Sequence, residues 1–102
     1  MPFIIETFDK PGHGHVRAKA RDEHLAYLDA NKAKLLACGG KLDDEGKAAT
    51  GGLYLLDVDT RGEAEAYIAA DPFTAVDLFE RVVITRWRKA FFDGKNCLAN
   101  AS

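Results

Sequence analysis

Cysteine is scarce in this sequence: Cys38 and Cys97 are the only two among 102 residues. They are too far apart for a C-x-x-C motif, and two cysteines are too few for a disulfide framework. No apolar run approaches the roughly 20 residues that a membrane-spanning helix needs. The N-terminal segment lacks the basic start and apolar core of a signal peptide. We therefore predict a cytoplasmic protein with no membrane partner.

The sequence also lacks an excess of charge, because 14 Lys and Arg residues oppose 16 Asp and Glu residues for a formal net charge of −2. Nucleic-acid-binding domains usually carry a basic patch. The basic residues between 81 and 89 alternate along a predicted strand and would scatter over two faces. The glycine-rich motifs of dinucleotide and phosphate sites are absent as well. We predict no nucleic-acid partner and no cofactor.

What the sequence does contain is an alternation of strand-like and helix-like segments that fits one domain. Strands are predicted at 3–8, around 40–42, at 52–58 and at 81–92, and helices at 18–37, 61–70 and 73–78. Glycines at 39 and 40 are expected to end the first helix, and Thr60 with Glu63 forms a capping box. This β-α-β-β-α-β order predicts an α+β, ferredoxin-like fold with a four-stranded antiparallel sheet. The predicted domain spans residues 1–92, and a flexible C-terminal tail spans 93–102.

The predicted strands are apolar on both faces. In 52–58, Tyr54 and Leu56 point one way while Leu53 and Leu55 point the other. A sheet with one covered face should alternate apolar and polar residues, and two helices on one side cannot cover both faces. We therefore predict a homodimer joined through sheet faces, with Trp87 or its strand neighbours partly buried; a higher homo-oligomer stays open.

Asp71 stands directly before Pro72, where it suits the N-cap of a short helix. His24 lies at the border of the apolar stripe of the first predicted helix. Taken singly, the two residues fit structural roles, a plain cap and a half-buried histidine bonded to a carbonyl. As a pair they could act as a general base, because a carboxylate on one ring nitrogen fixes the imidazole tautomer and makes the other nitrogen more basic. Arg21, one helical turn earlier, could hold an anionic group with two hydrogen bonds.

His13 and His15 lie two apart in a glycine-containing segment. Two imidazoles could contribute to a zinc or nickel site with His24 as a third ligand. No fourth ligand is evident, so a surface loop with incidental metal affinity is the favoured interpretation, and no metal site is predicted.

Several motifs occur together in a fixed order: "RDEHLAYL" (21–28), "ADPF" (70–73), "GGLYLLDV" (51–58) and "VVITRWRKAF" (82–91). In this combination residues 2–92 resemble the YciI-like family. The resemblance implies the dimeric α/β-barrel superfamily, in which two ferredoxin-like units pair their sheets into a barrel. It further implies catalytic residues His24 and Asp71 in a pocket on each protomer. Arg21, His15 and Phe73 are the predicted substrate-binding residues. One established activity of the family is dehydrochlorination of a chlorinated hydroxyquinol-type aromatic.

The leading functional hypothesis is a small enzyme or enzyme-like protein that performs cofactor-free acid/base chemistry on a small cyclic or aromatic, anionic compound. Elimination, isomerisation and hydrolysis are all compatible with one His–Asp base. The alternatives are a non-catalytic dimeric module that binds a small anionic metabolite in the same pocket, and an accessory subunit. The sequence leaves open whether the chain is catalytic.

Overall fold

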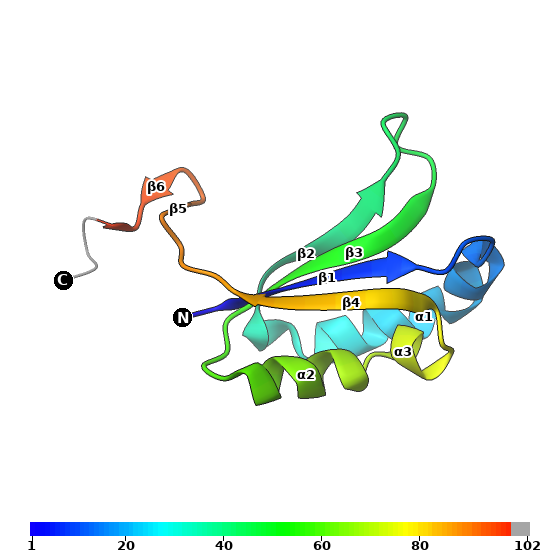
Figure 1. Cartoon of the computed structure of the whole chain (residues 1–102), viewed down its shortest axis with the longest axis horizontal. Helices are drawn as coiled ribbons and strands as arrows, with labels where there is room; N and C mark the ends of the chain where they lie inside the picture. The colour runs from blue at the N-terminus through cyan, green and yellow to red at the C-terminus, as the bar shows by residue number, and fades with distance from the viewer. Residues whose placement is uncertain (99–102) are drawn as a thin grey trace.

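The structure, a computed structural model, describes residues 1–98. Its elements follow in the order β1 (Phe3–Asp9), α1 (Gly14–Ala30), the 3-10 turn η1 (Lys32–Lys34), β2 (Leu35–Leu42), β3 (Ala49–Leu56), α2 (Arg61–Ala69), α3 (Pro72–Ala75), β4 (Phe79–Arg86), β5 (Phe91–Phe92) and β6 (Lys95–Asn96). Strands β1 to β4 form an antiparallel sheet in the order β2-β3-β1-β4. All three α-helices cover the same face of this sheet (Figure 1). The fold is the α+β, ferredoxin-like arrangement that the sequence predicts.

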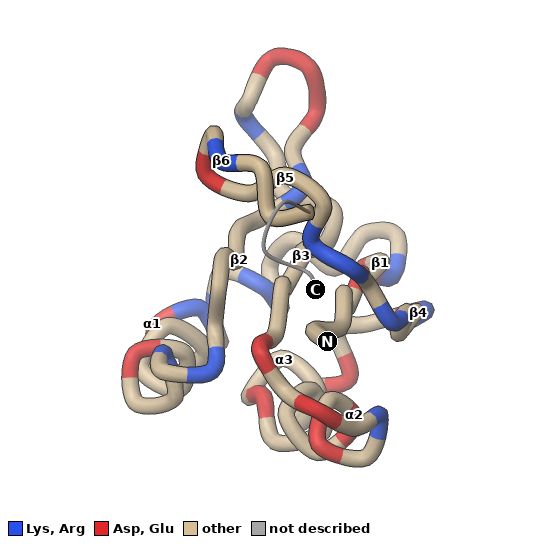
Figure 2. The backbone as a smooth tube through the Cα atoms, turned by 90° about the vertical axis from the view of Figure 1, so that its left-hand side faces the viewer, with Lys and Arg blue, Asp and Glu red and all other residues tan. Residues whose placement is uncertain are grey.

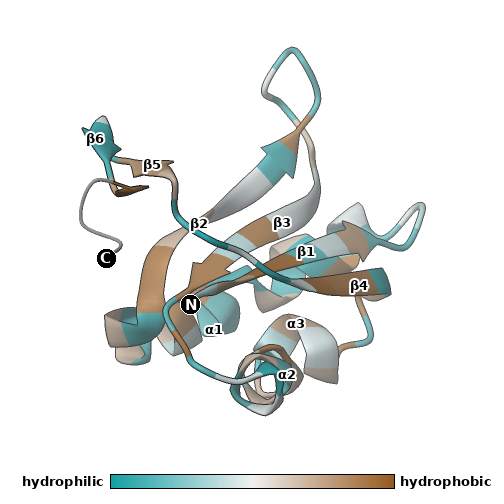
Figure 3. Cartoon of the chain, turned by 60° about the vertical axis from the view of Figure 1, so that its left-hand side comes forward, coloured by the Kyte–Doolittle hydropathy of each residue, from teal (hydrophilic) through white to brown (hydrophobic). Residues whose placement is uncertain are grey.

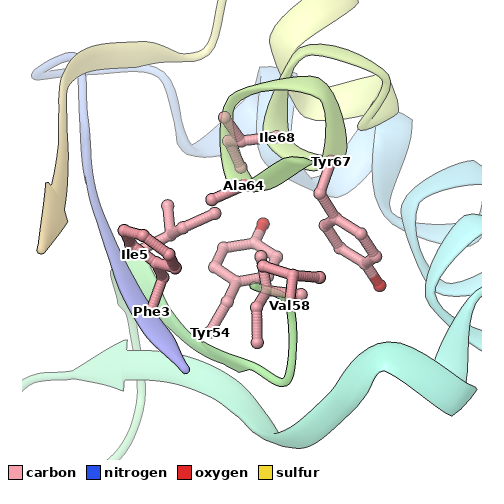
Figure 4. Packing of buried hydrophobic residues seen from close by; sticks show 8 residues of the cluster. Phe3, Ile5, Tyr54, Val58, Ala64, Tyr67 and Ile68 are labelled. Carbon is pink, nitrogen blue, oxygen red and sulfur yellow. The ribbon is translucent and has the colours of Figure 1, made fainter. Parts of the chain in front are cut away.

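The main core lies between the sheet and the helices. Phe3 and Ile5 of β1 alternate with half-exposed neighbours, and their cross-strand partners on β3 are Leu56 and Tyr54. These side chains meet the inner face of α2 (Figure 4). A smaller cluster of Ala20, Phe73 and Leu78 continues the core toward α3. None of the helices within residues 1–98 is long and apolar enough to cross a membrane.

The first helix differs from its predicted bounds of 18–37, since α1 begins at Gly14 and ends at Ala30. Leu35 and Leu36, whose spacing continued the helical pattern, belong to β2, where backbone pairing with β3 decides the conformation. Gly39 and Gly40 were predicted to end a helix, but they lie inside that strand and pair with Leu53 and Gly52. The predicted short strand at 40–42 is therefore eight residues long.

Three other boundaries also move. The predicted strand 52–58 is observed at Ala49–Leu56, and the predicted helix 73–78 is the single turn Pro72–Ala75. The predicted strand 81–92 is shorter, because β4 ends at Arg86. The predicted limit of the domain at residue 92 falls inside a hairpin, in which β5 pairs with β6. Residues 99–102 of the predicted tail lie outside the described residues.

The strands of the sheet are hydrophobic along much of their length (Figure 3), and some of these residues face away from the helices. Ile4 pairs with Leu55 and Glu6 pairs with Leu53 on the sheet face away from the helices, which we call the open face. Leu53 is 40% exposed. Apolar residues are thus present on both faces of the strands, as the sequence predicts. Coverage of the open face by a second copy stays a prediction.

Candidate active-site cleft

His24 is carried by α1 and is one of two buried residues of that helix, with Ala20 one turn earlier. Its ring points toward the start of α3, where Nδ1 lies 2.8 Å from Asp71 Oδ1 and 2.9 Å from Oδ2. The contact that the sequence predicts between these two residues is therefore present. Because Nδ1 faces a carboxylate, it carries the proton and donates it. Nε2, on the other side of the ring, has no hydrogen-bond partner within residues 1–98.

The Asp71 carboxylate is fully buried. Oδ1 also accepts a hydrogen bond from the Phe73 backbone N–H at 2.9 Å, which makes Asp71 the N-cap of α3. Oδ2 accepts one from the Tyr54 hydroxyl at 2.8 Å. A buried carboxylate is costly unless polar groups compensate it, and here three donors do so. Asp71 therefore caps a helix and holds an imidazole at the same time.

Burial and the nearby Asp71 charge raise the pKa of Tyr54, and the hydrogen bond to Asp71 raises it further. The phenol thus keeps its proton and acts as a donor. Although the Cys38 residue is exposed to solvent, the protein atoms around its sulfur, and secondly the Asp71 charge, raise the pKa of the thiol to about 11. Cys38 is therefore a neutral thiol near neutral pH, not a nucleophile.

Phe73 supports the imidazole from α3. Its ring stacks on His24 with centroids 3.9 Å apart and planes 13° from parallel. The Arg17 guanidinium lies 4.7 Å from the centroid of the same ring. Asp9 fixes this guanidinium through two hydrogen bonds, 2.7 Å from Nε and 3.1 Å from Nη2. The Phe73 ring and the Asp9–Arg17 ion pair therefore fix the positions of the His24 and Arg17 side chains relative to each other.

A cleft of about 410 Å³ opens between α1 and the β2–β3 hairpin beside this arrangement. His24, Phe73 and Tyr54 contribute to its walls, and so does Cys38. Its charged lining residues are Arg17, Arg21 and Lys47. Within residues 1–98 no carboxylate residue belongs to the lining, so the cleft favours an anionic or electron-rich ligand.

The structure brings most of the predicted site residues together. His24, Arg21 and Phe73 line the cleft, and Asp71 lies behind His24. His15 is not part of this lining; it is exposed on another side of α1 and borders a separate hollow with Val16 and Lys19. Among residues 1–98 no group of three or more His, Cys, Asp or Glu side chains is placed to hold a metal ion.

Sequence reasoning missed Arg17, Lys47, Tyr54 and Cys38. Arg17 precedes His24 by seven residues, which is two helical turns and hence the same face. That signal was hidden because the helix was predicted to begin at residue 18. Alternation placed Tyr54 on the strand face opposite Leu53 and Leu55, but nothing in the sequence indicated that its hydroxyl meets Asp71.

Comparisons with known proteins find relatives in sequence and in fold. The family model described as "YCII-related domain" matches residues 1–88. Protein YciI of Escherichia coli O6:H1 is 29% identical over 98 residues, covering 89% of this chain and all of that protein. The solved structure of 5-chloro-2-hydroxyhydroquinone dehydrochlorinase (TftG) from Burkholderia phenoliruptrix AC1100, in complex with 2,5-dihydroxybenzoquinone, is 33% identical with a TM-score of 0.80, covering 86% of this chain and 94% of that one. A putative antibiotic biosynthesis monooxygenase from Bacteroides thetaiotaomicron is 11% identical with a TM-score of 0.56, covers 93% of each chain, and shows the fold alone.

Proposed function

The chain belongs to the YCII-related domain family, and on that premise we propose that it is a cofactor-free acid/base enzyme acting on a small, hydroxylated, anionic ring compound. The observation that carries the proposal is the His24–Asp71 pair, whose Nδ1 is bound at 2.8 Å while the ring lines the cleft. The similarity to a dehydrochlorinase makes elimination the favoured reaction class.

In the proposed reaction, neutral His24 is the general base. Its Nε2 lone pair takes a proton from a ring hydroxyl or an activated C–H of the substrate. The leaving group stands on a tetrahedral carbon of the ring's keto tautomer. The electron pair of the broken O–H or C–H bond therefore forms a new C=O or C=C bond, any double bond in between shifts toward that carbon, and the leaving group, a halide in a dehydrochlorination, departs with its own bonding pair. Asp71 stabilises the imidazolium that results and keeps Nδ1 as the bound nitrogen. Nε2–H then returns its proton to solvent, which restores the base.

The arginines would hold the ionised oxygens of such a ring. Arg17 is fixed by Asp9 and stands beside Phe73, so it offers a guanidinium in a set position. Arg21 lines the cleft from an exposed position on α1 and is free to adapt to different ligands. A planar guanidinium can bind two oxygens at once, which a lysine ammonium cannot copy. Arg21→Lys should therefore weaken ligand binding more than it lowers the turnover rate.

The test compares His24→Gln with Glu23→Gln, a matched exchange at the adjacent exposed residue of α1, which does not line the cleft. Turnover is followed as chloride release from chlorinated hydroxyhydroquinones, and binding is measured by calorimetry with 2,5-dihydroxybenzoquinone as the probe. We expect His24→Gln to lower turnover by ~10²–10⁴-fold with little loss of binding, because general-base contributions fall in that range. Glu23→Gln should match the parent.

A folded His24→Gln protein with undiminished turnover would contradict this mechanism. Binding of the probe without turnover of any such substrate would favour the alternative, a non-catalytic module that binds small anions in the same cleft.

We further propose that the functional unit is a homodimer joined through the open face. Ile4, Leu53 and Leu55 leave apolar surface there that one chain does not cover. Burying such surface contributes about 25 cal/mol per Å².

A further inference from the structure

The last described residues form an arm that leaves the domain. After β4 ends at Arg86, the chain turns away on the side of the open face and folds back as the β5–β6 hairpin (Figure 1). We call residues 87–98 the C-terminal arm. Its root is fixed by a hydrogen bond from the Trp87 N–H to the Pro2 carbonyl at 2.8 Å. The family match ends at residue 88, so the hairpin lies beyond the part shared with the family.

The arm has little support from its own domain. Its two strands have two residues each, and an isolated two-stranded hairpin is only marginally stable in water. A hollow of about 540 Å³ separates it from Pro2 and Asp57. The radius of gyration, 14.4 Å, exceeds the roughly 13 Å expected for this chain length. Phe91 is 64% exposed and Leu98 48% exposed, so the arm presents apolar side chains that this chain does not cover.

A second projection rises on the same side of the sheet, at its other end. The strand register places Phe3 opposite Arg86 at the arm end and Phe8 opposite Gly51 at the end of the β2–β3 turn. This turn, residues 43–48, carries the exposed acids Asp43, Asp44 and Glu45 with one lysine. The arm carries the cations Arg88, Lys89 and Lys95 with one acid. The two projections thus have opposite charge (Figure 2).

Two copies that stack their open faces about a two-fold axis have two ways to place these projections. If the two-fold axis lies between the sheets and runs parallel to the strands, the same ends of the two copies face each other. The two arms then meet, the two acidic turns meet, and like charges approach. If the axis runs perpendicular to the strands, opposite ends face each other, and each arm meets the acidic turn of the other copy. Like-charge contacts are costly and complementary ones favour association. Charge therefore selects the second arrangement.

We propose that the C-terminal arm of one copy clamps the 43–48 turn of a second copy, with Phe91 packed against exposed Leu42. Leu42 is 55% exposed and lines the cleft together with Lys47, so the arm of the second copy would brace one wall of the candidate active site. This inference rests on the homodimer proposed above and is independent of the His24 chemistry.

The test is a charge exchange measured as a dimer dissociation constant by sedimentation velocity at low ionic strength. One variant reverses the arm (Arg88→Glu with Lys95→Glu), a second reverses the turn (Asp44→Lys with Glu45→Lys), and a third combines both. Each single reversal should weaken the dimer by at least ~10-fold, and the combination should return it to within ~3-fold of the parent. High salt should shrink the losses.

A matched reversal on the helix side, Lys19→Glu with Lys34→Glu, changes the same charge away from the open face and should leave dimerisation unchanged. Phe91→Ser should weaken the dimer at any ionic strength, because its contribution is apolar. Unchanged dissociation constants in both single reversals, or a combined variant no better than either alone, would overturn the arm–turn contact while leaving the dimer standing. A monomeric parent chain would overturn both, and the chloride-release assay on His24→Gln would remain a separate test of function.

Discussion

Three donors from three segments converge on the Asp71 carboxylate: the His24 ring from α1, the Tyr54 hydroxyl from β3 and the Phe73 N–H from α3. All three are N–H or O–H donors, so both side-chain oxygens of residue 71 must act as hydrogen-bond acceptors. An asparagine has one acceptor oxygen and an NH₂ group that would face a donor. Asp71→Asn should thus disturb the orientation of His24 even though asparagine is a good helix cap.

The Cys38 thiol offers a direct measurement of the field inside the cleft. Its pKa is raised to about 11, first by the protein atoms around its sulfur and second by the Asp71 charge, both of which disfavour a thiolate. In a Cys97→Ser variant, the rate of alkylation by iodoacetamide should climb about tenfold per pH unit from pH ~7 to ~9.5 without levelling, whereas an ordinary thiol levels above its pKa of ~8.5. A plateau by pH ~9 would contradict the raised pKa.

At the residue scale the sequence predicts the centre of the site better than its surroundings. His24 and Asp71 each stand in a recognisable local context, an amphipathic helix and an Asp-Pro helix start, and the resemblance to the YciI-like family is what paired them. The contacts of the Tyr54 hydroxyl and the Arg17–Asp9 ion pair could not be predicted, because they depend on how β3, α1 and the end of β1 meet in space. His15 shows the opposite case, a residue predicted to bind substrate that does not line the cleft. It is close to the site residues in sequence but lies on another side of α1.

At the scale of elements, the order of strands and helices followed from apolar periodicity, but the end of α1 did not. Leu35 and Leu36 keep the helical spacing, so local pattern alone cannot tell where the helix stops. The helix ends at Ala30, and the backbone of residues 35–42 pairs with β3 instead of continuing the helix. Such pairing is a long-range interaction that overrides the local preference.

Close packing between β1 and β3 makes Gly51 the most constrained glycine of the sheet. A Cβ on Gly51 would lie 2.0 Å from the Thr7 carbonyl oxygen, and β1 is held between two neighbouring strands and cannot shift. Gly51→Ala should lower the free energy of unfolding by at least ~2 kcal/mol, as expected for overpacking against backbone. Urea denaturation of the variant and the parent measures this difference.

Gly40→Ala is the matched control for that substitution. A Cβ on Gly40 would find its nearest neighbours, Ala49 Cβ and Gly51 O, at 3.8 Å, an ordinary contact distance. Its urea midpoint should stay close to that of the parent. Equal midpoints for Gly40→Ala and Gly51→Ala would show that β1 and β3 can separate at this point.

At the scale of the whole molecule, the chain gathers all of its tyrosines into the layer between helices and sheet. The sequence holds three tyrosines, Tyr27, Tyr54 and Tyr67. The Tyr27 hydroxyl donates to the Tyr67 carbonyl oxygen at 2.7 Å, and the Tyr67 hydroxyl is buried with no partner within residues 1–98. Burial is the main cause that raises the pKa of each phenol, to about 12 for Tyr67.

These shifts predict how the fold responds to alkali. A phenol whose pKa is higher in the folded than in the unfolded chain stabilises the fold fully below the unfolded value, ~10. Above that pH the unfolded chain releases protons that the folded chain retains, so the free energy of unfolding falls as pH rises toward the folded pKa values. The folded protein should therefore show little tyrosinate absorbance at pH ~10, where free tyrosine is half ionised. Absorbance should rise together with the loss of far-ultraviolet helical dichroism at higher pH. Tyrosinate that forms near pH ~10 while the helices stay intact would mean that the Tyr54 and Tyr67 hydroxyls reach solvent, which would contradict the burial of these two residues.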